Sequence, residues 1–168
     1  MSISMYQASV PVLLHGLTNL QNIIGKAQAH AAEKQIDPAA LTGDRLFPDM
    51  FPMYRQIYIA TDLAKGCAAR LAGLEPPVFD DTEMTFDELH TRIQKTIDYL
   101  KTFKAAQIDG SEERHIEQKT RNGSMEFKGL DYLCYFVLPN FYFHITTAYN
   151  ILRHNGVELG KRDYLGNH

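Results

Sequence analysis

The chain has 168 residues, of which 45% are hydrophobic, and it carries a formal net charge of −3. This length and apolar content are enough for one domain, residues 1–168, with a sizeable core. The negative charge argues against binding nucleic acid through a basic surface. The first residues lack the basic start of a signal peptide, and no apolar run is long enough to span a bilayer. We therefore expect a cytoplasmic protein with no membrane partner.

Residues 5–33 form the first amphipathic segment, with apolar residues at helical spacing. Pro11 leaves two alternatives for its start. Either the helix begins near Ser9, with the proline in its first turn, or a longer helix kinks at Pro11. The apolar positions are Val10, Leu13, Leu14, Leu17, Leu20, Ile24 and Ala27.

A second helix is expected over residues 53–71, after a loop at residues 35–52 that is rich in proline and turn residues. We expect this loop to be irregular and to lie across one end of the bundle. Small residues on the core face of the second helix allow another helix to approach closely. That face comprises Ile57, Thr61, Ala64, Ala68 and Leu71.

The third helix has the clearest start in the chain, because Thr85 and Glu88 form a capping box. Residues 73–82 before it contain Pro76 and Pro77 and are expected to be a linker. Its core face comprises Phe86, Leu89, Ile93, Ile97 and Leu100. Residues 114–120 and 124–128 then alternate weakly around Asn122 and Gly123, which predicts a β-hairpin.

The last helix is expected over residues 129–156, with one apolar stripe along it. The predicted stripe is Leu130, Leu133, Val137, Phe141, Ala148 and Ile151. Aromatic side chains cover several faces of this helix, which suits packing on one side and a loop or subunit contact on the other; they are Phe136, Phe141, Tyr142 and Phe143.

The remaining residues form a tail that we expect to be an extended arm. Tyr164 and Leu165 could pack back onto the bundle or contact a second subunit. Lys161, Arg162 and Asp163 are expected to be solvated. The two cysteines, Cys67 and Cys134, lie among apolar residues on expected helices, so free thiols in the core are favoured over a disulfide.

His144 is the one histidine that the periodicity places inward, since it falls on the apolar stripe of the last helix. Asn140 lies one turn earlier on the same face. His144 is either a buried neutral imidazole, bonded to Asn140, Thr61 or a tyrosine, or a metal ligand or proton-transfer residue. Five other histidines, at positions 15, 30, 90, 115 and 154, point outward, lie at the edge of a helix face, or fall in the hairpin or at a helix end.

Two aspartates are further candidates for a site. Asp62 lies near the expected place on the second helix but off its core face, so a solvated or ion-paired role is favoured. Asp49, in the segment PDMFP, could reach over the end of the bundle, although a turn-stabilising role is favoured. The chain has no phosphate-binding glycine loop, nucleophile elbow, CxxC or HExxH motif.

The order of helices, the PDMFP loop, the hairpin and the stretch PNFYFHITTAYNILRHNGVELGKRDYLG together resemble an uncharacterised bacterial family within the DinB/YfiT-like superfamily. The resemblance covers nearly the whole chain. It implies an all-α fold, a four-helix bundle with up-down-down-up topology and a short hairpin before the last helix. It also implies a homodimer.

Characterised members of that superfamily use three histidines to hold a divalent metal such as nickel or zinc for thiol-dependent transfer, isomerisation or hydrolysis. By alignment with the superfamily pattern HxxxHHRGQ, His144 takes the second metal histidine and Asn140 takes the first. Thr61, Asp62 and Leu63 stand where the second helix would supply the third. Amide oxygen suits hard cations better than zinc or nickel, so this ligand set is incomplete.

Two functional hypotheses follow. In the first, the protein is a non-catalytic bundle that binds an apolar small molecule or a partner, and His144 is structural. In the second, it is a metal-dependent enzyme with an altered site, in which His144 is ligand or base, Asn140 its partner, and Asp62 or Asp49 a carboxylate. Thr61, Asp49 and Phe141 are the expected pocket residues.

Overall fold

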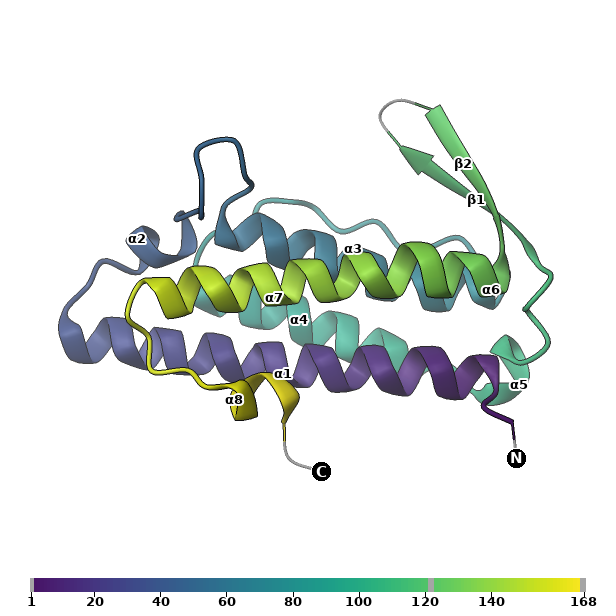
Figure 1. Cartoon of the computed structure of the whole chain (residues 1–168), viewed down its shortest axis with the longest axis horizontal. Helices are drawn as coiled ribbons and strands as arrows, with labels where there is room; N and C mark the ends of the chain where they lie inside the picture. The colour runs from purple at the N-terminus through teal and green to yellow at the C-terminus, as the bar shows by residue number, and fades with distance from the viewer. Residues whose placement is uncertain (1, 121–122, 167–168) are drawn as a thin grey trace.

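The computed structural model describes residues 2–120 and 123–166. Its body is a bundle of long helices: α1 (Met5–Lys34), α3 (Met53–Leu71), α4 (Phe86–Lys101) and α7 (Leu138–His154). In Figure 1, α1 and α7 run in one direction along the bundle, and α3 and α4 run in the other. The predicted up-down-down-up bundle is therefore confirmed. Because α3 and α4 are parallel, residues 72–85 must return along the whole bundle before α4 begins.

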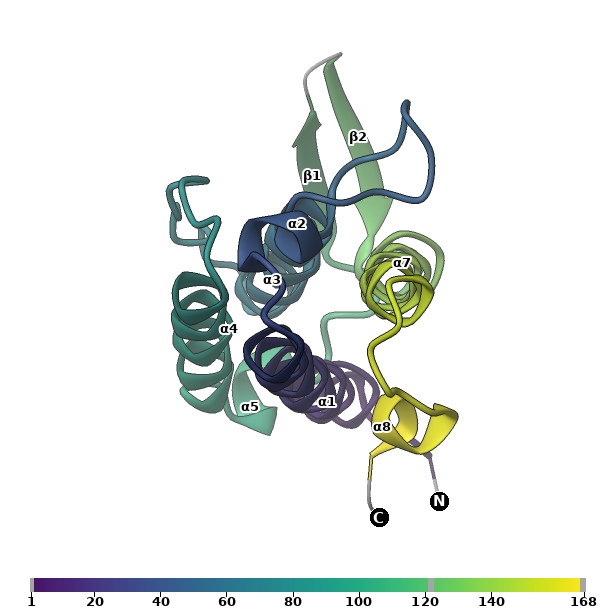
Figure 2. The ribbon, with the colours of Figure 1, turned by 90° about the vertical axis from the view of Figure 1, so that its left-hand side faces the viewer.

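The core is built from the inner faces of these helices. Figure 2 shows them nearly end on, and the contacting pairs include α3 with α7, α1 with α4, and α3 with α4. Each helix contributes fully buried aliphatic or aromatic side chains, because apolar residues recur every three to four positions along it. Among them are Leu13, Leu17, Leu20, Ile57, Leu71, Leu89, Ile93 and Phe141.

Helix α1 begins at Met5, before the start near Ser9 that one alternative predicted, because Ser4 caps it. The Ser4 and Gln7 side chains bond each other's backbone N–H groups, which forms a capping box. Pro11 therefore lies inside the helix, where it removes the hydrogen bond that residue 11 would donate to the Gln7 carbonyl. Of the two alternatives, the longer helix is therefore the one present, with its start before Pro11.

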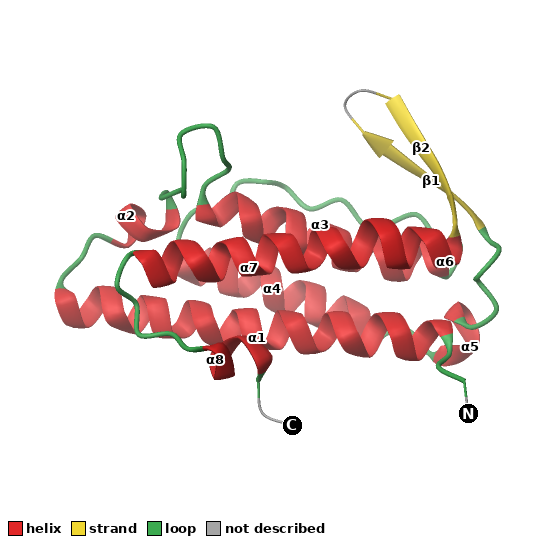
Figure 3. Ribbon diagram, in the orientation of Figure 1, coloured by secondary structure: helices red, strands yellow, loops and turns green. Residues whose placement is uncertain are grey.

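Two segments that we expected to be irregular contain short helices (Figure 3). Within residues 35–52, α2 (Pro38–Thr42) begins at Asp37, whose carboxylate accepts the Ala39 N–H. The tail is not an extended arm, because it forms α8 (Lys161–Leu165). A further short helix, α5 (Ala105–Ile108), precedes the hairpin.

The tail packs back onto the bundle, as one of its two alternatives predicted. The Tyr164 hydroxyl accepts a hydrogen bond from Thr146 at 2.8 Å, and Asn19 donates to the Tyr164 carbonyl at 3.0 Å. Asp163 is not simply solvated, since its carboxylate bonds Lys26 at 2.6 Å and accepts the Gly160 N–H. His15, which is exposed as predicted, lies 2.7 Å from the Leu165 carbonyl through Nε2.

The predicted hairpin is present as β1 (His115–Thr120) and β2 (Gly123–Lys128), which pair antiparallel. Asn122 of the predicted turn lies outside the described residues. Ile116 is buried, and opposite it Phe127 packs against the rings of Tyr132 and Phe136. These contacts hold the base of the hairpin to the last helix. The hairpin and residues 43–52 both project from the side of the bundle formed by α3 and α7 (Figures 1 and 2).

The start of the last helix is not regular. After α6 (Gly129–Asp131), residues Tyr132–Val137 form a π-helix that leads into α7, and the Leu138 N–H bonds the Leu133 carbonyl five residues back. Pro139 follows this segment. In an α-helix its ring would clash with the carbonyl of Tyr135, and the wider π turn avoids that contact.

The π-helix corrects two predictions. An extra residue in the turn shifts the buried face by one position for residues that precede it, so Leu130 is 46% exposed and Tyr132 is fully buried. Leu130 therefore does not belong to the apolar stripe. Cys134 falls in the same segment and is exposed, whereas Cys67 is buried as predicted; both are free thiols.

No helix in the described part of the chain is long and apolar enough to cross a membrane.

Candidate functional site

His144 is the centre of the candidate site, and it faces the bundle as the periodicity predicted. Its side chain is 9% exposed. Its Nδ1 lies 2.7 Å from Oε1 of Gln56, which projects from the first turn of α3. The Gln56 amide nitrogen in turn donates to the Phe51 carbonyl at 2.8 Å. The two polar side chains thus join α7, α3 and the loop before α3.

These bonds define the protonation state of the imidazole. Because the Gln56 oxygen only accepts, His144 Nδ1 carries the proton, and in the neutral ring Nε2 keeps its lone pair. Burial lowers the pKa of His144 from 6.5 to about 4, so the ring is neutral at physiological pH. In the described chain, Ser111 Oγ is the one buried side-chain nitrogen or oxygen without a hydrogen bond. His144 Nε2, which makes no hydrogen bond there, is consequently within reach of solvent.

The partners expected for His144 were wrong. Asn140 Nδ2 donates to the Phe136 carbonyl at 2.6 Å, so its amide is turned along α7. The buried Thr61 hydroxyl donates to carbonyls of its own helix and accepts a hydrogen bond from Arg92 Nε at 2.8 Å. The partner is Gln56, because it lies in the first turn of α3, opposite His144 on the neighbouring helix, whereas Thr61 lies farther along α3.

Arg92 organises the second polar cluster of the bundle, although it is only 1% exposed. Its guanidinium bonds Asp62 at 3.0 Å, Asp81 at 3.1 Å and Glu83 at 3.0 Å. It also donates to the Asp80 carbonyl at 2.8 Å. Arg92 therefore fastens the linker between α3 and α4 to both helices.

Asp62 belongs to this cluster, as the ion-paired alternative predicted. Its carboxylate also bonds Lys65, three residues and almost one turn farther along α3. Asp49 is exposed in the loop before α3, and the carboxylate that reaches the end of α7 is that of Asp44, which accepts a hydrogen bond from Asn155 at 2.6 Å. Phe141 is fully buried, where its ring meets Gly16 of α1.

The donor set does not fit the divalent metal that the resemblance implies. No group of three His, Cys, Asp or Glu side chains within residues 2–120 and 123–166 could hold a metal ion. Next to His144 stands an amide, Gln56, and the other candidates bond groups elsewhere: Asn140 bonds its own helix, and Asp62 bonds Arg92. A single imidazole with amide neighbours is a weak site for zinc or nickel.

Comparisons with known proteins place this chain in a family. Residues 5–165 match the model of a domain of unknown function, DUF1993. The chain belongs to this family. A crystal structure of a DinB family member from Shewanella denitrificans is similar to it, with 40% sequence identity and a TM-score of 0.89 over 97% of this chain and 92% of that one. A comparison with curated proteins finds no match. This DUF1993 chain thus has a DinB-like fold.

Gln56 and Arg92 were not identified as site residues from the sequence, although the spacing of each one was informative. Gln56 lies three residues after Met53 and four before Ala60, on the buried face of α3. Arg92 lies three residues after Leu89 and four before Thr96, on the buried face of α4. A polar residue at core spacing has to find buried hydrogen-bond partners, so each position predicts a polar contact between elements.

Proposed function

We propose that this protein is a non-catalytic member of its family that binds an apolar small molecule, and that His144 is a structural residue. The observation that carries the proposal is the hydrogen bond between His144 Nδ1 and Gln56, which joins α7 to α3. The bond pairs the imidazole Nδ1 with an amide oxygen, at a position where a metal site would need further acidic or imidazole ligands.

The surroundings of this pair suit an apolar ligand. The Phe143 ring meets the His144 ring edge on, at a centroid distance of 5.2 Å. Phe51, whose carbonyl accepts from Gln56, carries the Arg55 guanidinium 4.2 Å from its ring centroid. Both phenylalanine rings are partly exposed. A ligand that covers them would bury aromatic surface and could donate a hydrogen bond to His144 Nε2.

One observation favours the second hypothesis, a metal-dependent enzyme of transferase, isomerase or hydrolase type. The free lone pair of His144 Nε2 is itself able to bind a metal, and Asn140 lies one turn away. For this hypothesis the missing ligands would have to come from substrate, water or another subunit.

Elemental analysis of untagged protein separates the two hypotheses, together with melting scans in nickel, zinc, manganese and a chelator. We expect metal at less than about one tenth of the protein concentration and an unchanged Tm in every scan. Two results would establish the metal-dependent alternative. One is stoichiometric metal whose removal by chelator lowers the Tm of the wild-type protein. The other is a lower Tm for His144→Leu than for the wild type when both are treated with the same metal.

A ligand screen tests the positive half of the proposal. Apolar small molecules that raise the Tm of the wild-type protein should lose that effect in Phe143→Ala, since the substitution removes exposed aromatic surface beside His144. Val78→Ala is the matched control, because Val78 is exposed on the linker. Equal loss in both variants would count against a site at His144.

A further inference from the structure

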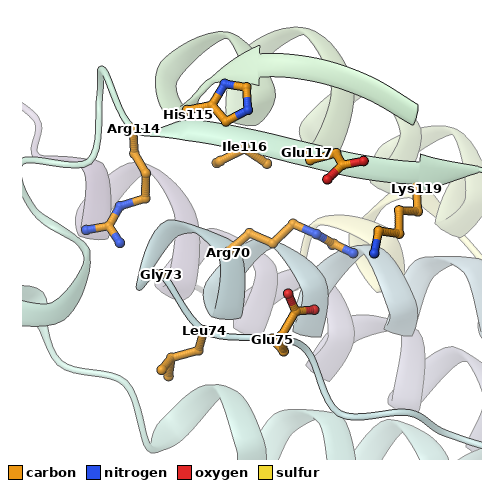
Figure 4. A pocket seen from close by; sticks show the side chains of 9 residues that line it. All are labelled: Arg70, Gly73, Leu74, Glu75, Arg114, His115, Ile116, Glu117 and Lys119. Atoms are coloured by element: carbon orange, nitrogen blue, oxygen red, sulfur yellow. The ribbon is translucent and has the colours of Figure 1, made fainter.

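A cavity of about 420 Å³ lies between β1 and the C-terminal end of α3 (Figure 4). Its wall includes Arg70 of α3 and Arg114 and Lys119 of the hairpin side, together with Glu75 and Glu117. Arg70 is 14 residues from Gln56 on the same helix, a separation of about 21 Å at 1.5 Å per residue. The cavity is therefore a different site from the His144 pair.

The basic side chains of this cavity form no ion pair within the part of the chain that the structure describes. In the described residues, none of Arg70, Arg114 and Lys119 lies within ion-pair distance of a carboxylate, although Glu75 and Glu117 border the same cavity. In Figure 4 the ends of Arg70 and Lys119 approach each other from α3 and β1. Three basic and two acidic side chains line the cavity, so it has a net positive charge, and a bound anion would be attracted to it.

Arg70 is held in place by buried groups. Its Nη1 donates to the Tyr132 hydroxyl at 3.0 Å, and that hydroxyl lies 3.4 Å from Gln118 Oε1. Burial raises the pKa of Tyr132 to about 12, so the phenol keeps its proton and donates it to Gln118. Gly66 makes room for the guanidinium, because a Cβ there would lie 2.4 Å from Arg70 Nη1. The nitrogens Nε and Nη2 of Arg70 are left for a ligand.

The Arg114 guanidinium packs against a second glycine, Gly73. A Cβ at Gly73 would lie 2.1 Å from Arg114 Nη1, and the φ angle of Gly73, +74°, is one that other residues rarely adopt. Both guanidinium groups of the cavity thus rest against glycine backbone. This arrangement reduces the side-chain freedom that binding an anion would otherwise remove.

We propose that this cavity binds a small molecule through a carboxylate or phosphate group. Guanidinium groups bind either group with two parallel hydrogen bonds, and the cavity volume is that of a small-molecule site. Arg70 and Lys119 bind the anionic group, and Arg114 contacts the part of the ligand that lies nearer Gly73. Glu75 and Glu117 repel longer polyanions, so the ligand is a compact anion. The proposal is independent of His144 and stands if that residue is only structural.

Isothermal titration calorimetry at low ionic strength, with inorganic phosphate and with succinate as probes, tests the proposal. We expect saturable binding of at least one probe, about tenfold weaker in Arg114→Gln/Lys119→Gln. Arg70 is left unchanged because it also bonds Tyr132. The matched control, Lys101→Gln/Lys161→Gln, removes two exposed charges elsewhere and should bind like the wild type. Glu117→Gln should bind more tightly, since it removes a repulsive charge.

The two probes also identify the anionic group, because tighter binding of phosphate or of succinate assigns a phosphate or a carboxylate ligand. The proposal is overturned if neither probe binds saturably to the wild type. It is equally overturned if the control variant loses as much affinity as Arg114→Gln/Lys119→Gln.

Discussion

At the scale of single residues, the buried imidazole of His144 links stability to pH. In the folded protein its pKa is about 4, below the ordinary value of 6.5 that it regains on unfolding. As the pH falls through 6.5, His144 is protonated in the unfolded chain but stays neutral in the folded chain. The free energy of unfolding therefore decreases until about pH 4.

We therefore predict that the wild-type protein loses about 2 kcal/mol of unfolding free energy between pH 7 and pH 4 through this residue, after allowance for the solvent access of the ring. Urea unfolding at several pH values in that range measures this loss of unfolding free energy. His144→Gln is the reference, because every other titrating group is retained. Parallel losses of stability in the two proteins would contradict the assignment.

Arg92 carries a second prediction at this scale. Arg92→Ala leaves Asp62, Asp81 and Glu83 without their shared partner and empties a buried volume, so we expect a loss of about 3 kcal/mol in urea unfolding. Residues 72–85 should also become sensitive to proteases. Lys95→Ala is the control, since Lys95 lies 4.0 Å from the ring centroid of Phe79 and should cost less than about 1 kcal/mol. Similar losses in the two variants would refute the role of Arg92.

At the scale of helices, α1 and α7 approach each other closely at Gly16. A Cβ there would lie 2.5 Å from Cε1 of the buried Phe141, whereas a Cβ at Gly25 would meet nothing nearer than His90 at 3.8 Å. Alanine favours helix over glycine by up to about 1 kcal/mol, so the two sites should respond with opposite signs.

We predict that Gly16→Ala lowers the unfolding free energy by about 1 to 2 kcal/mol, because the overpacked Phe141 must move. Gly25→Ala should raise it by about 0.5 kcal/mol or more. Thermal melts of both variants at one pH provide the comparison. Stabilisation by Gly16→Ala would show that the helices separate there without cost.

Helix periodicity predicted most of these elements, because apolar spacing and the Thr85 capping box are local signals. The exposed Leu130 shows where it fails. A π turn beside Pro139 depends on one extra residue, which a fixed period of 100° per residue cannot detect. His144 was placed correctly for the same local reason. Its partner Gln56 could not be chosen from the sequence, since that bond depends on how α3 and α7 are set against each other.

At the scale of the whole molecule, the outer face of α7 exposes large aromatic side chains. Phe143 is 56% exposed and Tyr142 is 41% exposed, and Tyr135 in the π-helix before α7 is exposed as well. Monomeric proteins rarely leave several large apolar side chains together on one face. We propose that two copies of the chain associate through it, which agrees with the homodimer expected from the resemblance.

This proposal predicts a dimer mass in light scattering at micromolar concentration and a monomer for Tyr142→Lys/Phe143→Lys, because a charge at each position would be buried without a partner. Val78→Lys is the control, since Val78 is 90% exposed on the linker, and it should remain a dimer. Far-ultraviolet circular dichroism separates dissociation from unfolding. If the wild type is a monomer at every concentration, these aromatic side chains serve another contact, and a ligand beside His144 becomes the stronger explanation for their exposure.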